Sequence, residues 1–262
     1  DGGQTWSVLS TGLLSNNKIN QLKFKGNLSA VENPQFLYAA TDNGIYKMSL
    51  NVTLNYTTYA NWNMMAVPNV ISDFAKTTVW PTATSTAGRW DNGCQCYIAT
   101  DPLRLGEGYF VRWASPTAVS YTGWPIYNDA MQVSTGWNIL GSVSNSVPTS
   151  TIVQNPPGNV ITPYYTYTGN QYVQITTLTP GLGAWVKVAA NGTLTLPSSS
   201  PKVGSGEINL ASLDKFTVSD ANEYRQSMYV RNGTATLGKE TGYSDELPPE
   251  APLRIFDARF KT

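Results

Sequence analysis

LRLGEGYFVRW (103–113) and LTPGLGAWVKV (178–188) share one pattern, in which a leucine and two glycines at a spacing of two precede an aromatic and β-branched run. Such a run favours a strand, and the glycines suit a tight turn with positive φ or a close approach between two backbones. A nucleotide-binding loop would need a helix after the glycines, and the pattern indicates a strand instead. The glycines are therefore predicted to be structural: Gly106, Gly108, Gly181 and Gly183.

A displacement of 75 residues also aligns the sequence around these two stretches without a gap. Six residues are identical between 97–114 and 172–189, against about one expected from ordinary composition. The pair Trp-Asn recurs as well, at 62–63 and at 137–138. These identities predict an internal duplication. We expect two homologous sandwich-type β-modules, residues 59–127 and 128–200, that can pack as one pseudo-symmetric sandwich.

The composition excludes several classes of partner. The chain has 262 residues, of which 41% are hydrophobic and 13% are charged, with a formal net charge of zero. Many Tyr and Thr residues between Gly and Pro turns predict an all-β fold with a real core. Basic clusters and long apolar runs are missing from the sequence, so neither nucleic acid nor membrane insertion is expected.

The sequence contains no histidine. This excludes Ser-His-Asp and Cys-His catalysis, histidine-ligated zinc and the usual general base near neutral pH. Two of the 17 Asp and Glu residues could in principle flank a glycosidic bond, but the sequence singles out no pair. We therefore expect no catalytic, cofactor-binding or metal-binding residues, and a protein that is not an enzyme.

Residues 1–58 are predicted to form a four-stranded antiparallel blade. Its expected strands are TWSVLS (5–10), INQLKFKG (19–26), QFLYAAT (35–41) and GIYKMSL (44–50). The Asp42-Asn43-Gly44 turn between the last two is a strong hairpin signal, because Asn and Gly both adopt positive φ.

This region carries a first resemblance. DGGQTW (1–6) resembles the second half of an Asp-box, Ser-x-Asp-x-Gly-x-Thr-Trp, as found in secreted multi-blade propellers. The resemblance implies a structural motif made of Asp1, Gly3, Thr5 and Trp6, in which Asp1 and Gly3 shape the turn and Trp6 packs into the blade. The next expected box is missing, so the blade is expected to stand alone with unpaired edges that recruit another strand.

Residues 201–262 are expected to form a small C-terminal β-domain with the extended, proline-rich stretch ELPPEAP (246–252) before its last strand. A second resemblance lies here and in the preceding module. The order GWN, PGLGAWVKV and ELPPEAPLRIFDARF resembles the C-terminal region of large surface proteins exported by the type IX secretion system of Gram-negative bacteria. It implies an extracellular or cell-surface location. Both resemblances imply that the chain is part of a longer polypeptide.

Cys94 and Cys96 form a Cys-x-Cys. On an extended strand, residues i and i+2 are too far apart for a relaxed disulfide, so a bridge between them needs a local bend. The spacing favours free thiols and leaves a local disulfide and an intermolecular bridge open.

The aromatic residues suggest a glycan-binding surface or a core. Tyr164, Tyr165, Tyr167 and Trp124 are candidates for stacking on sugar rings, and alternation places Tyr165 and Tyr167 on one face of a strand. Trp62, Trp137 and Trp185 recur within the repeat and are expected in the core.

Taken as a whole, the sequence predicts a non-enzymatic exported structural protein, either self-assembling into a homo-oligomer or homopolymer or adhesive, through strand pairing between subunits. The alternative is a carbohydrate-binding module of a larger hydrolase that recognises surface glycans. A third reading, a sialidase-like fragment, has only the Asp-box in its favour.

Overall fold

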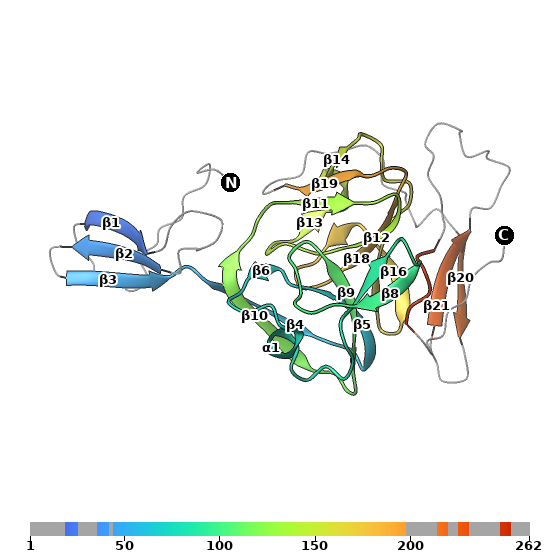
Figure 1. The fold of residues 1–262 in the computed structure, drawn as a ribbon, viewed down its shortest axis with the longest axis horizontal. Helices are drawn as coiled ribbons and strands as arrows, with labels where there is room; N and C mark the ends of the chain where they lie inside the picture. Colours follow the sequence, from blue (N-terminus) through green and yellow to red (C-terminus); the bar gives the residue numbers. More distant parts are fainter. Residues whose placement is uncertain are drawn as a thin grey trace.

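The computed structural model describes residues 19–25, 36–41, 44–197, 214–219, 225–230 and 247–252. These residues are almost entirely antiparallel β-structure, which confirms the predicted fold class (Figure 1). The helical segments among them are one turn each, α1 (Lys76–Val79) and η1 (Thr149–Thr151).

The first half of the central sandwich has two sheets. Its strands are β4 (Val52–Thr57), β5 (Asn61–Ala66), β6 (Asn69–Val70), β7 (Gly88–Asp91), β8 (Cys96–Ala99), β9 (Gly108–Trp113) and β10 (Ala118–Pro125). The outer sheet has the order β4-β10-β6 and the inner sheet the order β5-β9-β7-β8. We call this half module 1.

The second half, module 2, repeats this arrangement. Its strands are β11 (Asp129–Val133), β12 (Gly136–Leu140), β13 (Val147–Pro148), β14 (Val153–Asn155), β15 (Tyr164–Thr168), β16 (Gln171–Ile175), β17 (Thr177–Leu178), β18 (Ala184–Val188) and β19 (Gly192–Leu196). The outer sheet has the order β11-β19-β14, the inner sheet the order β12-β18-β15-β16, and β13 pairs with β17.

Strand alternation builds four layers of sheet. On β9, Tyr109 and Val111 face the core inside module 1, whereas Phe110 faces module 2. On β18, Val186 faces the core inside module 2 and Trp185 faces module 1. Successive side chains of a strand point to opposite faces, so both inner sheets are buried on two sides. The core therefore has three parts, one within each module and one between them.

Backbone geometry recurs at the same displacement as the sequence identities. Positive φ occurs at Asn61 and Gly136, at Gln95 and Asn170, and at Gly106 and Gly181, each pair 75 residues apart. One strand departs from this spacing. Gly88 of β7 pairs with Phe110, but Tyr165 of β15, not residue 163, pairs with Trp185. The β15-β16 hairpin of module 2 is therefore two residues shorter than the β7-β8 hairpin of module 1.

The two modules meet on a pseudo-twofold axis at their glycines. A Cβ on Gly108 would lie 3.3 Å from the Cα of Gly183, and a Cβ on Gly183 would lie 3.3 Å from the Cα of Gly108. Two reciprocal backbone hydrogen bonds flank this contact, from Ala66 N to Gly181 O and from Gly141 N to Gly106 O, both 2.9 Å. The glycines predicted to permit close backbone approach lie at this contact.

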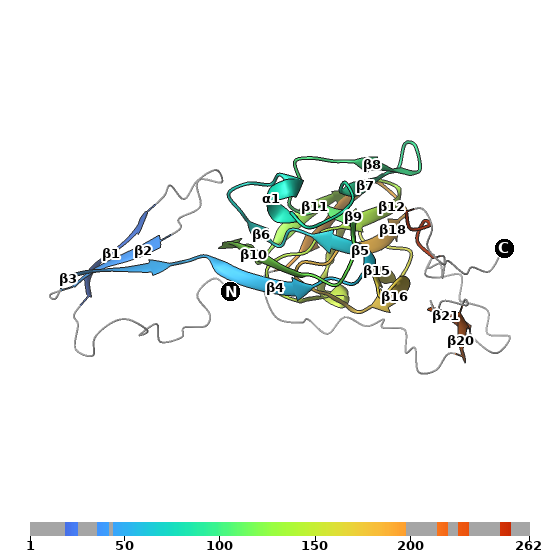
Figure 2. The same cartoon turned by 90° about the horizontal axis from the view of Figure 1, so that it is seen from below.

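Two smaller sheets lie outside the sandwich (Figures 1 and 2). The first contains β1 (Ile19–Lys25), β2 (Phe36–Thr41) and β3 (Gly44–Ser49) in that order, and the second contains β20 (Asp214–Ser219) and β21 (Arg225–Val230).

The region predicted as a four-stranded blade thus shows three of its expected strands. The Asp-box residues Asp1, Gly3, Thr5 and Trp6 lie outside the described residues. The boundary expected at residue 58 needs correction, because β4 pairs with β10 and belongs to module 1.

Candidate functional site: the seam between the modules

Aromatic side chains fill the space between the two inner sheets. They occupy equivalent positions in the modules: Trp62, Trp90, Tyr97 and Phe110 on one side, Trp137, Tyr167, Tyr172 and Trp185 on the other. We call this cluster the aromatic seam. Its contacts are nearly symmetric edge-to-face pairs, with ring centroids 5.4 Å apart for Trp90–Trp185 and 5.3 Å apart for Tyr167–Phe110. Such pairs add to the stabilisation from burial alone.

The expectation that Trp62, Trp137 and Trp185 belong to the core agrees with their positions. Trp137 and Trp185 are buried and Trp62 is half-buried against the same cluster. The tyrosines proposed for sugar stacking are buried and do not lie on the surface. Tyr164, Tyr165 and Tyr167 are at most 7% exposed, because β15 is packed on both faces. A buried ring cannot stack on a glycan, so this part of the hypothesis is wrong.

Trp124, the fourth sugar-stacking candidate, lies near the end of β10 and is half-buried. It belongs to the outer sheet of module 1, where it pairs with Val70 of β6. None of the aromatic candidates therefore forms an open stacking platform with another.

The Asn of each Trp-Asn pair holds the turn before its strand. Asn63 donates from Nδ2 to the carbonyl oxygens of Tyr59 and Asn61 and accepts at Oδ1 from Tyr59 N. Asn138 makes the same three hydrogen bonds, with Ser134 and Gly136. The recurrence of this asparagine in the sequence is explained by its three backbone contacts.

A polar cleft of about 300 Å³ opens at one side of the seam. Module 1 contributes the polar side chains of Arg89, Asp91, Asn92 and Glu107 to its lining. Module 2 contributes those of Gln132, Ser134 and Asn138. Several hydrogen-bonding groups thus converge on a concave surface.

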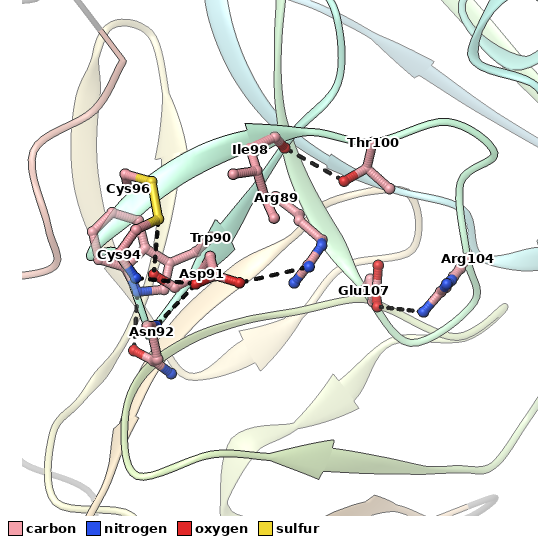
Figure 3. Close-up of polar contacts among 11 residues, drawn as sticks. Arg89, Trp90, Asp91, Asn92, Cys94, Cys96, Ile98, Thr100, Arg104 and Glu107 are labelled. Atoms are coloured by element: carbon pink, nitrogen blue, oxygen red, sulfur yellow. Dashed lines mark hydrogen bonds and ion pairs between the residues drawn. A yellow bond between two sulfur atoms is a disulfide. The ribbon is translucent and has the colours of Figure 1, made fainter.

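The charged groups of the cleft are held in place by their neighbours (Figure 3). An ion pair joins Arg89 Nη2 to Asp91 Oδ2 at 3.6 Å. Tyr109 donates its hydroxyl to Glu107 Oε2 at 2.8 Å and accepts from Arg104 N. Burial, and then the nearby Glu107 carboxylate, raise the pKa of Tyr109 well above its ordinary value. Tyr109 therefore stays protonated and keeps donating to that carboxylate at ordinary pH.

The equivalent side of the pseudo-twofold axis has a different lining. Leu182 stands 75 residues after Glu107, and the strand register makes Thr166 and Thr168 the module 2 equivalents of Arg89 and Asp91. Thr166 is buried and donates its hydroxyl to Gly183 O. Among the described residues, the module 2 equivalents of Arg89, Asp91 and Glu107 are therefore uncharged.

A disulfide bond joins Cys94 and Cys96 beside the cleft, and of the three alternatives left open by the sequence this is the local bridge (Figure 3). The bend that it needs is present, since Gln95 has a φ of 51° and the two Cα atoms lie 5.2 Å apart. The same loop is bound by Asp91, whose Oδ1 accepts from Gly93 N and Cys94 N. The prediction of free thiols is wrong, because the chain turns between the two cysteines and does not continue as an extended strand.

A proline-rich segment, residues 247–252, lies against the aromatic seam. Pro248 is buried, and Leu247 and Ala251 pack against the seam. Tyr97 donates its hydroxyl to Glu250 O at 2.9 Å, and Tyr172 donates to Pro249 O at 2.6 Å. Tyr97 and Tyr172 are equivalent residues of the two modules. We call residues 247–252 the proline segment.

Sequence reasoning missed both the cleft and the proline segment's site. The cleft residues are scattered in the sequence, but Glu107 and Leu182 differ inside an otherwise matching repeat, and such a charge difference is a usable signal. Among the residues that the structure describes, no cluster of three metal-ligating side chains is present. No helix in the described ranges has the length and apolar character needed to cross a bilayer.

Comparisons of the chain with protein-family models, with curated proteins and with solved structures gave no match.

Proposed function

We propose that the chain is a non-enzymatic structural protein, exported to the surface of a Gram-negative bacterium, that assembles or adheres through strand pairing between subunits. The supporting observation is the sheet of β1, β2 and β3. Its outer strands β1 and β3 pair with no further strand in the part of the chain that the structure describes. Unpaired strand edges readily accept a strand from a neighbouring molecule.

The contrast between this sheet and the sandwich supports the proposal. The inner sheets of the sandwich are covered on both faces, which leaves neither face open to another sheet. Ile45 on β3 is 77% exposed, the largest exposure among the large apolar side chains described. A zero net charge also lowers the repulsion between copies. The resemblances to Asp-box propellers and to type IX cargo support the extracellular location.

Sedimentation and electron microscopy of the purified chain test this proposal. We expect polymers whose critical concentration rises about tenfold in Ile45→Lys, because a charge on an edge strand opposes pairing. Tyr127→Lys is the matched control, since Tyr127 is 47% exposed and lies between strands. A wild-type chain that stays monomeric at high concentration and shows no surface adhesion contradicts the proposal.

The polar cleft supports carbohydrate binding as a second function. Sugars are recognised by converging charged and amide side chains, and Arg89, Asp91 and Asn92 supply these groups in one place. Binding on a glycan array should be lost in Arg89→Ala and in Glu107→Leu, which copies the lining of the other module. Arg104→Ala is the control, since Arg104 contacts Glu107 but does not line the cleft. An array without any bound glycan contradicts this function.

A further inference from the structure

Tyr97 and Tyr172 present their hydroxyls to two successive carbonyl groups of the chain. These carbonyls, Pro249 O and Glu250 O, belong to the proline segment. The two tyrosines come from β8 and β16, which occupy equivalent places in modules 1 and 2. Two hydroxyl groups related by the pseudo-twofold axis thus donate hydrogen bonds to two adjacent backbone carbonyls.

The segment has the properties of a ligand with a preset conformation. Pro248, Pro249 and Pro252 fix φ near −65°, and each proline disfavours the helical conformation of the residue before it. An extended proline-rich chain makes no internal hydrogen bonds, so its carbonyls stay available to side-chain donors. Aromatic-lined grooves recognise such chains because little conformational entropy is lost on binding.

The apolar contacts give the site its selectivity. Pro248 is buried, and Leu247 and Ala251 pack on the aromatic seam, whereas Glu250 between them is exposed. The site therefore selects apolar residues at defined positions and tolerates a charged side chain between them.

The segment can leave this site without breaking a sheet. No strand pairing among the described residues includes 247–252. Sixteen residues, 231–246, connect the end of β21, which contacts β16, to Leu247. Fully extended, a connection of this length spans up to about 50 Å.

From these contacts we infer that Tyr97 and Tyr172 form a recognition site for extended proline-rich peptides, occupied by the chain's own proline segment and open to exchange with the same segment of a second copy. The inference goes beyond the strand-edge assembly proposed above and does not depend on it.

The test uses the full chain and a fluorescent peptide, ELPPEAPLR, that copies residues 246–254. In Pro248→Gly/Pro249→Gly the resident segment loses its preset conformation and competes less well. Anisotropy should then show at least tenfold tighter apparent peptide binding than to the wild-type chain. Adding Tyr97→Phe and Tyr172→Phe should weaken binding about 25-fold, at about fivefold for each lost hydrogen bond. A peptide with glycines at the positions of Pro248 and Pro249 should bind at least tenfold more weakly.

Tyr59→Phe serves as the matched control, since Tyr59 is 46% exposed and, among the described residues, shares no hydrogen bond with the proline segment. Its peptide affinity should equal that of the parent. The inference is overturned if the peptide fails to bind Pro248→Gly/Pro249→Gly, or if the two phenylalanines leave its affinity unchanged.

A second measurement covers the case in which the glycine variant does not fold. Cleavage of the wild-type chain after Glu250 by a glutamate-specific protease reports how often the segment is released. Tyr97→Phe/Tyr172→Phe, with an unchanged far-ultraviolet spectrum, should be cleaved there at least tenfold faster. Equal cleavage rates overturn the inference. Either result is read on monomeric chain, so it is independent of whether polymers form.

Discussion

Modules 1 and 2 share their framework but differ along one side of the seam. Both place positive φ at the same three positions, both hold a turn with an asparagine, and their glycines contact each other. In contrast, Glu107 of module 1 corresponds to Leu182 of module 2, and the disulfide loop corresponds to the Gly169-Asn170 turn. The shared residues hold the modules together, and the differing residues supply the charged groups of the cleft.

The largest expected effect comes from the glycine contact. Gly108→Ala would place a Cβ 2.7 Å from Leu140 O, a backbone atom, and against the Ile139 side chain. We expect a loss of about 3 kcal/mol in the free energy of unfolding. Gly183→Ala should cost less, about 2 kcal/mol, because its nearest neighbour is the flexible Met64 side chain at 2.9 Å.

Chemical denaturation measures both values. Gly88→Ala is the control in the same inner sheet, since its Cβ would have an ordinary 3.5 Å contact with Tyr97. Equal stability of Gly108→Ala and Gly88→Ala would show that the modules do not meet at the glycines.

Asn63 and Asn138, which hold the equivalent turns of the two modules, should give the next largest effect. Their substitution tests whether equivalent residues contribute equally to the free energy of unfolding. Asn63 is 1% exposed, whereas Asn138 is half-buried. Removing either leaves three backbone groups without this partner, and the loss is greater where water cannot replace it. We expect about 2.5 kcal/mol for Asn63→Ala and about 1.5 kcal/mol for Asn138→Ala, measured by denaturant unfolding. An equal or reversed order would contradict this use of burial.

The disulfide loop should matter less. Cys94→Ser/Cys96→Ser opens a loop of only a few residues, so little chain entropy is regained on unfolding. We expect a loss of about 1 kcal/mol, with the cleft-side ion pair of Arg89 and Asp91 intact. Thermal unfolding with and without reductant checks this, and the Ser variant should no longer respond to reductant. A response that persists in the variant would place the redox effect elsewhere.

The smallest effect is expected at the start of α1, which module 2 replaces by η1. The carboxylate of Asp73 accepts from the Thr78 hydroxyl and from Ala75 N, and these bonds lower its pKa below the ordinary 3.8. A lowered folded pKa stabilises the protein above pH 3.8, and this stabilisation is lost as pH falls through the folded value. In thermal unfolding at pH 6, Asp73→Asn should therefore have a slightly lower Tm than the wild-type chain. This difference in Tm should vanish near pH 2. A difference that grows in acid would contradict the assignment.

Much of the framework could be predicted from the sequence. The glycine spacing, the Trp-Asn pairs and strand alternation follow from local rules, and Gly108 and Gly183 lie where such rules place them. The burial of Tyr164, Tyr165 and Tyr167 could not be deduced, because it depends on two sheets facing each other. The cleft could not be deduced either, since Arg89 and Gln132 line one surface only after the modules pack.

The glycine contact on the pseudo-twofold axis has an evolutionary consequence. In a dimer of identical subunits, one codon change alters both copies of a symmetric surface, so a useful residue on one side must be tolerated on the other. Here the two modules are encoded by separate parts of one gene and belong to one chain. Their association therefore does not depend on protein concentration. A charged residue such as Glu107 can therefore be acquired in one module while its equivalent, Leu182, remains apolar. One side of the seam can then gain a polar cleft without a change on the other side.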